Sequence, residues 1–260
     1  MSQRINAPVC EACGAIMVLR TARNGVNKGK KFWGCSSFPK CRNTKDATEY
    51  EKSISFTSDS MDVNFRPTGF KEDFVVFDIE TTGFNPYNDR ITEICGLLIR
   101  DGILVPDVKF STFVNPQKPI PHDVIRINGI TDKMVANAPL EHEAVRSFLD
   151  FSANKVLIAH NAKFDIGFIN SVISRNSMKY DLICIDTLAL SRFLYPSFEN
   201  HKLDTLAVKL SLGEFNHHRA EADTNILASV FLNFLELLEC RYNLNSISTL
   251  ERLIPFALVK

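Results

Sequence analysis

The pattern of apolar and polar positions changes at residue 73. From there on, short apolar runs rich in Val and Ile alternate with stretches in which apolar residues recur at helical spacing. The runs predict strands over 74–80, 91–102, 109–116, 155–160 and 182–187. The helical spacing predicts helices over 164–175, 202–210 and 222–240.

The order of these elements indicates a fold class. The first three strands follow one another directly, with an Asp-Gly turn after the second, which is compatible with an antiparallel meander. The later strands alternate with helices, which is typical of an α/β domain with a mixed sheet. We therefore expect a five-stranded mixed sheet flanked by helices.

The chain of 260 residues is long enough for one large domain and a small one. Residues 46–72 are polar and lack a sustained period, so we interpret them as a linker. This predicts a small domain over 1–45, a large one over 73–240 and a C-terminal tail over 241–260. The tail ends in an apolar stretch and either covers an edge of the large domain or docks on a partner; local packing is favoured.

Composition is that of a soluble globular protein, with 45% apolar and 23% charged residues. No apolar stretch reaches the roughly 18 residues that span a bilayer. The start of the chain lacks the apolar core of a secretory signal, so we expect neither membrane nor export.

The formal net charge of zero conceals an asymmetry. Residues 1–45 carry nine basic side chains and one acidic one, a net charge of +8, so the remainder carries −8. The two parts are therefore expected to have different electrostatic tasks.

Four cysteines mark the small domain: Cys10, Cys13, Cys35 and Cys41. Two pairs of thiols at this spacing predict one tetrahedral zinc ion. A segment of about 40 residues buries too little apolar surface to fold alone, so it needs a bound metal ion for stability. The alternative is free or disulfide-bonded cysteines, and without a secretory signal disulfides are disfavoured.

Basic and aromatic residues lie between these cysteines. They are Arg20, Arg23, Lys28, Lys30, Lys31, Phe32 and Trp33, with Phe38 following Cys35. Cations follow phosphates and aromatic faces stack on unpaired bases, which favours single-stranded nucleic acid as the ligand. The alternative is that Phe32, Trp33 or both form the small core of this domain.

The segment CEACGAIMVLRTARNGVNKGKKFWGCSSFPKCRNT, with its run FWGCSSFPKC, resembles the four-cysteine zinc ribbons of bacterial type IA DNA topoisomerases. The resemblance implies a zinc ribbon that binds single-stranded DNA. It does not imply topoisomerase activity, because it covers only about 35 residues.

Carboxylates gather at three places in the large domain. Asp78 and Glu80 lie two apart on a predicted strand and so share one face, Asp165 begins a predicted helix, and Asp223 begins the last long one. His218 precedes Asp223 by five residues, with His217 as an equally plausible neighbour. Four carboxylates suit a site with two divalent metal ions, and a nearby histidine suits proton abstraction from water.

The segments FDIETTGF, AHNAKFD and HHRAEAD resemble the three motifs of the DnaQ-like 3′→5′ exonucleases of the four-carboxylate-plus-histidine (DEDDh) type. Residues 115–135 and 185–210 are also similar to the proofreading exonuclease region of bacterial replicative polymerases, particularly the PolC type and the epsilon subunit. The resemblance implies a ribonuclease H-like fold. It implies that Asp78, Glu80, Asp165 and Asp223 hold two magnesium or manganese ions. It also implies that His218 deprotonates a water that attacks the terminal phosphodiester, releasing a nucleoside 5′-monophosphate.

The resemblance extends to the substrate. In the family the turn after the first motif contacts the 3′-terminal nucleotide, which here implies Thr81, Thr82, Gly83 and Phe84. Phe84 either stacks on the last base or belongs to the core. His160 and Asn161 are expected to line the same cleft, while Cys95 and Cys184 are expected in core packing.

The leading hypothesis is a metal-dependent 3′→5′ exonuclease acting on DNA, with the ribbon binding single strands, in the bacterial cytoplasm or nucleoid. Its expected partners are single-stranded 3′ ends and a polymerase or repair complex, and its expected role is proofreading or repair. The alternatives are an exonuclease that trims RNA and a non-catalytic nucleic-acid-binding scaffold. The presence of all four carboxylates and His218 disfavours the scaffold.

Overall fold

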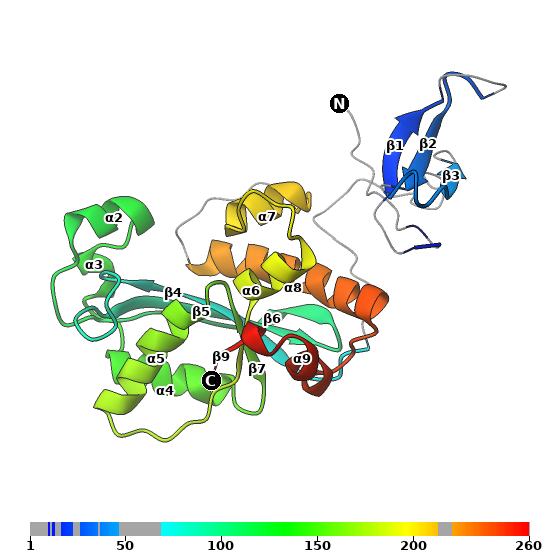
Figure 1. Cartoon of the computed structure of the whole chain (residues 1–260). Helices are drawn as coiled ribbons and strands as arrows, with labels where there is room; N and C mark the ends of the chain where they lie inside the picture. The colour runs from blue at the N-terminus through cyan, green and yellow to red at the C-terminus, as the bar shows by residue number, and fades with distance from the viewer. Residues whose placement is uncertain are drawn as a thin grey trace. The chain divides into compact units, whose positions relative to one another are not determined.

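Tertiary contacts divide the chain into two units, Met1–Asp62 and Val63–Lys260. The computed structural model (Figure 1) describes residues 10, 12–13, 17–22, 27–35, 37–46, 69–212 and 220–259. Most of the expected linker, 47–68, therefore lies outside the described residues, as does His218.

The N-terminal unit contains a three-stranded antiparallel sheet in the order β1-β2-β3. The strands are β1 (Met17–Thr21), β2 (Lys31–Cys35) and β3 (Thr44–Asp46). Trp33 is 4% exposed and packs with Met17, Cys10 and Cys35, so it belongs to the small core rather than to a stacking surface. Phe38 is 56% exposed and is therefore available at the surface.

The second unit is built on a mixed sheet in the order β6-β5-β4-β7-β8-β9. Its strands are β4 (Phe74–Thr81), β5 (Ile91–Arg100), β6 (Ile103–Phe113), β7 (Val156–Ala159), β8 (Cys184–Asp186) and β9 (Leu258–Val259). β4 pairs antiparallel with β5 and parallel with β7. The mixed sheet is confirmed, but it has six strands rather than five, because the tail contributes β9.

The hairpin between β5 and β6 is longer than expected. Asp101 (φ 51°) and Gly102 (φ 70°) form a two-residue loop in the left-handed region, as a type I′ turn requires. β6 therefore begins at Ile103 instead of residue 109. The first half of β6 is largely exposed and contains Pro106, which an edge strand tolerates. Because this half is not an apolar run, the sequence pattern did not predict it as a strand.

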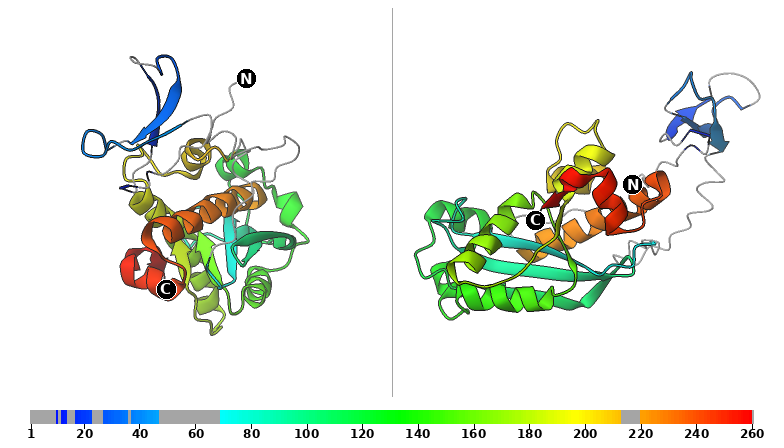
Figure 2. Two further views of the ribbon diagram at one scale, coloured as in Figure 1. Left: turned by 90° about the vertical axis from the view of Figure 1, so that its right-hand side faces the viewer. Right: turned by 60° about the horizontal axis from the view of Figure 1, so that its bottom comes forward.

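Helices cover both faces of the sheet (Figures 1 and 2). α4 (Glu141–Phe151) and α5 (Lys163–Arg175) pack on one face. The other face carries α6 (Thr187–Leu194), α7 (Leu203–Lys209) and the long α8 (Ala220–Tyr242). The short helices α2 (His122–Asn128) and α3 (Asp132–Val135) follow β6.

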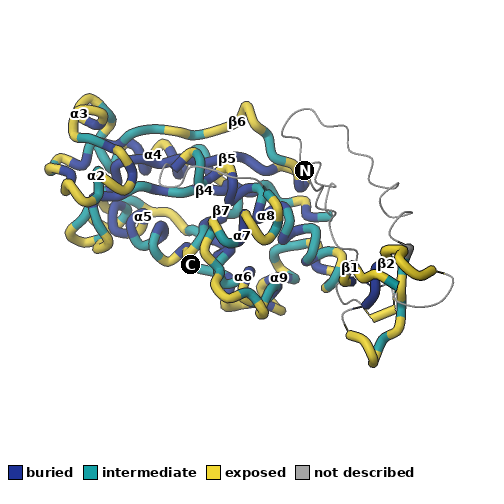
Figure 3. The backbone as a smooth tube through the Cα atoms, turned by 90° about the horizontal axis from the view of Figure 1, so that it is seen from above, coloured by how far each residue is buried: buried dark blue, intermediate teal, exposed yellow. Residues whose placement is uncertain are grey.

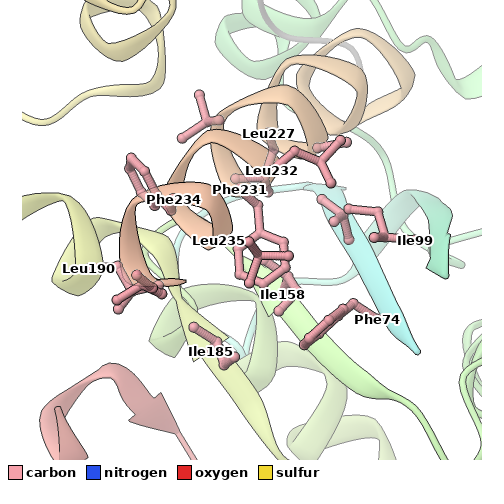
Figure 4. Packing of buried hydrophobic residues seen from close by; sticks show 14 of the residues in the cluster. Phe74, Ile99, Ile158, Ile185, Leu190, Leu227, Phe231, Leu232, Phe234 and Leu235 are labelled. Atoms are coloured by element: carbon pink, nitrogen blue, oxygen red, sulfur yellow. The ribbon is translucent and has the colours of Figure 1, made fainter. Parts of the chain in front are cut away.

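Alternation along β4 divides the core between these two faces. Phe74 and Val76 face the α8 side, where Phe74 meets Phe231 of α8 at 5.1 Å between ring centroids (Figure 4). Val75 and Phe77 face the α4–α5 side. By the same period of two, the positions after Val76 on the α8 side are Asp78 and Glu80, so the apolar face ends in carboxylates.

The C-terminal tail packs locally, as favoured from the sequence. It forms α9 (Ile247–Leu253), the 3₁₀ turn η1 (Pro255–Ala257) and β9, which pairs antiparallel with β8. Leu250, Ile254 and Ala257 are buried in the core beside α8. Figure 3 colours the backbone of the described residues by burial. The tail thus covers one edge of the sheet. Among the described residues, no helix combines the length and apolarity needed to cross a bilayer.

Candidate active site

Three carboxylates converge where β4 ends beneath the start of α8. Asp78 and Glu80 come from β4 and Asp223 from the first turn of α8, and their oxygen atoms lie within 4.8 Å of one another. All three side chains are half-buried. The convergence follows from the fold, because α8 packs on the face of β4 to which Asp78 and Glu80 belong.

Asp165 lies beside this group and is 3% exposed. It occupies the first turn of α5, as the sequence predicts, and its carboxylate accepts hydrogen bonds from its own N–H and that of Ile79. Burial raises the pKa of Asp165 to about 8, and the charges of Asp186 and Glu80 add to the effect. The structure thus brings the four predicted carboxylates into one neighbourhood, three of them close enough to share an ion.

This arrangement fits divalent cations. The pKa of Asp78 is raised well above its usual range by burial and then by the charges of Asp165, Glu80, Asp223 and Glu93. So many carboxylates together repel one another unless positive charge is placed among them. Carboxylate oxygens are hard ligands that suit magnesium or manganese.

Glu93 is a fifth carboxylate that the sequence reasoning missed. It is 4% exposed on β5, directly opposite Glu80 in the strand register, and its Oε2 accepts a hydrogen bond of 3.3 Å from the Ala220 N–H. Glu93 is the one charged residue within the apolar run 91–99. Charged residues are seldom buried without a partner, so a glutamate within an apolar strand could have identified Glu93 as a candidate site residue.

The first turn of α8 is held against the sheet by polar contacts. Besides the bond from Glu93 to Ala220, the Lys109 Nζ lies 2.8 Å from Glu221 Oε1, and the Thr224 hydroxyl hydrogen-bonds the Cys95 thiol. These contacts flank Asp223 on both sides in sequence. They fix the position from which Asp223 approaches the strand carboxylates.

Asn128 orients Glu80. It is the last residue of α2 and is 3% exposed. Its Nδ2 donates to Glu80 Oε2 at 3.1 Å, while its Oδ1 accepts from the Ile130 N–H at 3.0 Å. Asn128 was also missed, because its link to Glu80 spans 48 positions and has no local pattern.

The turn after β4 is braced internally. The Thr82 hydroxyl donates to Asp89 Oδ1 at 3.4 Å and accepts from the Arg90 N–H at 3.0 Å. Gly83 leaves room for the Asp89 carboxylate, which a Cβ at that position would strike. Thr81 is buried and donates to the Gly83 carbonyl at 2.6 Å.

Phe84 is not a core residue, since it is 84% exposed. Its ring meets Phe164 edge-on, with 6.4 Å between centroids. The rigid turn therefore presents an aromatic face to solvent close to the start of α5.

His160 and Asn161 lie in the turn between β7 and α5. His160 Nδ1 lies 2.9 Å from Thr187 Oγ1, and a second hydrogen bond joins the ring to the His201 backbone. Burial lowers the pKa of His160. The Asn161 N–H donates to Asp186 Oδ1 at 3.0 Å, and Asp186, another missed residue, caps α6.

Two further predictions concern the buried cysteines and the histidines before Asp223. Cys95 and Cys184 are fully buried, as expected for core packing. His217 and His218 lie outside the described residues, so the expected base remains a prediction from the sequence.

In the N-terminal unit the four predicted cysteines form one group. Their sulfur atoms all lie within 4.8 Å of one another, with 3.6 Å between Cys10 and Cys41 and 3.3 Å between Cys13 and Cys35. No disulfide joins any of the four, so their sulfur atoms are available to a metal ion. Sulfur atoms around a tetrahedral zinc ion at about 2.3 Å stand about 3.8 Å apart, close to these separations.

Polar groups support this cysteine cluster. The Asn43 Nδ2 donates to Cys10 Sγ at 3.5 Å and the Ser37 N–H to Cys35 Sγ at 3.4 Å. Such outer contacts orient the ligands of a metal site. The composition and grouping therefore fit zinc.

The surface of the ribbon combines cations with an aromatic ring. The Arg20 guanidinium lies over the Phe38 ring at 5.7 Å from its centroid, and Lys28, Lys30 and Lys31 are exposed. Arg23 lies outside the described residues.

Two family models match the chain. Residues 75–231 match the exonuclease family, and residues 8–50 match the topoisomerase DNA-binding C4 zinc finger. The first match covers more than half of the chain and contains Asp78, Glu80, Asp165 and Asp223.

Curated relatives and solved structures agree with this match. The PolC-type DNA polymerase III of Caldanaerobacter subterraneus subsp. tengcongensis is 44% identical over 167 residues, which are 64% of this chain and 12% of that protein. The Bacillus subtilis enzyme is 39% identical over 168 residues, with the same coverage of both chains. The chain thus spans about an eighth of the length of these relatives.

Among solved structures, exonuclease X in complex with 5′-overhanging duplex DNA is 26% identical with a TM-score of 0.50, covering 63% of this chain and 91% of that one. The nuclease domain of 3′hExo, a DEDDh family member bound to rAMP, shares the fold with a TM-score of 0.57 at 19% identity, covering 64% and 93%. The chain therefore belongs to the exonuclease family, and its residues 8–50 match a topoisomerase-type C4 zinc ribbon.

Proposed function

We propose that the chain removes nucleotides from the 3′ ends of DNA by metal-dependent hydrolysis and releases nucleoside 5′-monophosphates. The observation that carries the proposal is the convergence of Asp78, Glu80 and Asp223 within 4.8 Å, with Asp165 beside them. A non-catalytic scaffold has no need of this costly concentration of negative charge.

Two magnesium or manganese ions are the proposed occupants, held by Asp78, Glu80, Asp165 and Asp223. When bound, such ions neutralise the carboxylates and stabilise charge on the entering and leaving oxygens of a phosphodiester. The protein's part is to hold the ligands in place. Asn128 fixes Glu80, and the contacts from Glu93 and Lys109 fix the turn that carries Asp223.

His218 is the proposed general base. It precedes Asp223 by five residues, and an unperturbed imidazole titrates near 6.5, so its neutral form accepts a proton from water around neutral pH.

The turn formed by Thr81, Thr82, Gly83 and Phe84 is proposed to receive the 3′-terminal nucleotide. Its internal hydrogen bonds make it a rigid surface, and the exposed Phe84 ring offers a face on which any base can stack. His160 and Asn161 are proposed to line the same cleft, close to Asp165.

The zinc ribbon is proposed to bind single-stranded DNA. Its support is the exposed Lys28, Lys30 and Lys31 together with the surface ring of Phe38. A linked second site raises the effective concentration of substrate at the first. We infer that the ribbon keeps a strand near the nuclease between successive cuts.

DNA is favoured over RNA because the relatives at 36–44% identity are DNA polymerases and exonuclease X was solved with duplex DNA. The same relatives, all bacterial, support a place in the cytoplasm or nucleoid of a bacterium. They also support a polymerase or repair complex as partner, in proofreading or in repair.

The test is degradation of matched 5′-labelled DNA and RNA oligonucleotides, single- and double-stranded, by wild type and by Asp223→Asn. We expect DNA to be shortened stepwise from its 3′ end faster than RNA, with nucleoside 5′-monophosphates as product. Asp223→Asn should lose this activity while keeping its fold.

Asp204→Asn is the matched control. Asp204 is an exposed carboxylate in the first turn of α7, and its loss should leave the rate unchanged. Faster shortening of RNA would reverse the proposed substrate, and equal rates for wild type and Asp223→Asn would refute the site.

A further inference from the structure

We propose that a pocket beside the carboxylate site binds a phosphate of the substrate strand on the 5′ side of the bond that is cut. The pocket has a volume of about 570 Å³. Its walls come from the β7–α5 turn, from α6 and from the loop before α7. The inference rests on the proposed function and extends it to a subsite.

The first observation is the charge of the lining. Arg192 on α6 and Lys202 before α7 both line the pocket and are exposed. Neither side-chain cation forms a hydrogen bond or ion pair with any residue in the described part of the chain. Glu199 is the one acidic residue of the lining, so positive charge is in excess.

The second observation is that the walls are fixed. His160 bridges the Thr187 hydroxyl and the His201 backbone, and His201 Nδ1 lies 2.9 Å from Ser191 Oγ. These bonds tie the loop before α7 to α6 and to the turn after β7. The cations therefore stand on a preformed wall, which reduces the entropy lost on binding.

The third observation is the location. Asn161 lines the pocket and lies four residues before Asp165, and both approach Asp186. Asn161 therefore joins the pocket to the turn that leads to Asp165. A strand whose last nucleotide rests at the Phe84 turn would pass its next phosphates into this pocket.

The ligand chemistry is a nucleotide phosphate, which an internal phosphodiester or a released nucleoside monophosphate can supply. The preformed cationic wall next to Asp165 favours the internal phosphodiester. Cations that contact phosphates along a single strand contribute about 0.7 each to the slope of log affinity against log salt concentration.

The test compares KM and kcat for single-stranded hexathymidylate and for the p-nitrophenyl ester of thymidine 5′-monophosphate, which has no internal phosphodiester. Arg192→Gln and Lys202→Gln should each raise KM for the hexamer about fivefold at low salt. They should leave kcat and the KM of the ester unchanged and should lower the salt slope. Glu199→Gln should act in the opposite direction and lower KM for the hexamer.

Arg146→Gln is the matched control, since Arg146 is an exposed cation on α4, away from the pocket. Equal KM values for the hexamer in all these variants would overturn the proposal. Weaker inhibition by thymidine 5′-monophosphate with an unchanged hexamer KM would assign the pocket to the product and overturn the strand assignment. A wild type that cleaves neither substrate would instead refute the proposed function.

Discussion

Asp78 and Glu80 show how one strand serves both the core and the chemistry. The face of β4 that buries Phe74 and Val76 against α8 continues into these two carboxylates, and α8 returns Asp223 to the same place. The cost of gathering negative charge is visible in the raised pKa of Asp78, caused by burial and neighbouring carboxylates. The site is therefore built to be completed by cations.

The proposed base is tested by comparing two adjacent histidines. His218→Ala should lower kcat by about 10²- to 10⁴-fold, the usual contribution of a positioned general base. His217→Ala is the control and should retain the rate. The measurement is initial velocity on single-stranded DNA across pH 6 to 9. A larger loss in His217→Ala than in His218→Ala would transfer the role to His217.

Asp165 predicts how stability depends on pH without metal. Burial holds its pKa at about 8 in the folded protein, above the value of about 3.9 in an unfolded chain. The folded state thus binds the proton more tightly, and this stabilisation, complete below the unfolded pKa, is lost as pH rises towards 8.

We expect the melting temperature in EDTA to fall between pH 5 and pH 8. Magnesium should restore stability at pH 8, because it binds the folded state. Asp165→Asn should have a flatter melting profile over the same range. An EDTA profile that is equally steep in wild type and Asp165→Asn would contradict the assignment.

At the residue scale, the sequence predicted the site residues that belong to short motifs on a strand or a helix. Asp78, Glu80, Asp165 and Asp223 could be predicted because each lies within a short motif on a strand or helix. Glu93 and Asn128 could not, since they reach the site through strand pairing and a long-range hydrogen bond. The sequence also could not predict whether the Phe84 side chain is buried or exposed, because its exposure depends on the whole fold.

At the scale of elements, secondary structure was predictable where apolar runs were strong. β4, β7, β8, α5 and α8 lie close to their predicted ranges. The first half of β6 was missed because its residues face solvent. α4 was missed although Ala144, Val145, Phe148 and Leu149 form a buried stripe at helical spacing. β9 has only two residues and forms by pairing with β8, so it has no signal of its own.

The β5–β6 hairpin gives a test at this scale. Gly102 has φ 70°, so Gly102→Ala should destabilise the domain by about 1 kcal/mol. Gly167→Ala is the contrast, because Gly167 lies inside α5, where a Cβ meets only ordinary contact with Pro86, and alanine is the better helix former. Thermal melts should show a lower midpoint for the first variant and an equal or higher one for the second. A lower melting midpoint for Gly167→Ala than for Gly102→Ala would contradict the assignment of a type I′ turn.

At the scale of the whole molecule, charge is distributed unevenly along the chain. Residues 1–45, which contain the four clustered cysteines, carry a net charge of +8, and the remaining residues carry −8 and include the four carboxylates. A basic module suits binding to a phosphate backbone, and the acidic module suits cations.

Deleting residues 1–45 tests this division. The truncated protein should bind single-stranded DNA more weakly, with a smaller salt dependence, because its phosphate contacts are fewer. Its kcat on short oligonucleotides should be retained, since the carboxylate site lies wholly in the second unit. Fluorescence anisotropy at several salt concentrations is the measurement. Equal affinity of both forms at every salt concentration would refute the ribbon as a tether.

The most direct test of the central claim is the ladder of products from a 5′-labelled single-stranded DNA. Wild type with magnesium should shorten the strand one nucleotide at a time from its 3′ end. The ladder should vanish in EDTA, return when magnesium is restored, and be absent in a folded Asp78→Ala variant. A ladder that persists in EDTA or in Asp78→Ala, or no ladder from wild type with magnesium, would contradict the account.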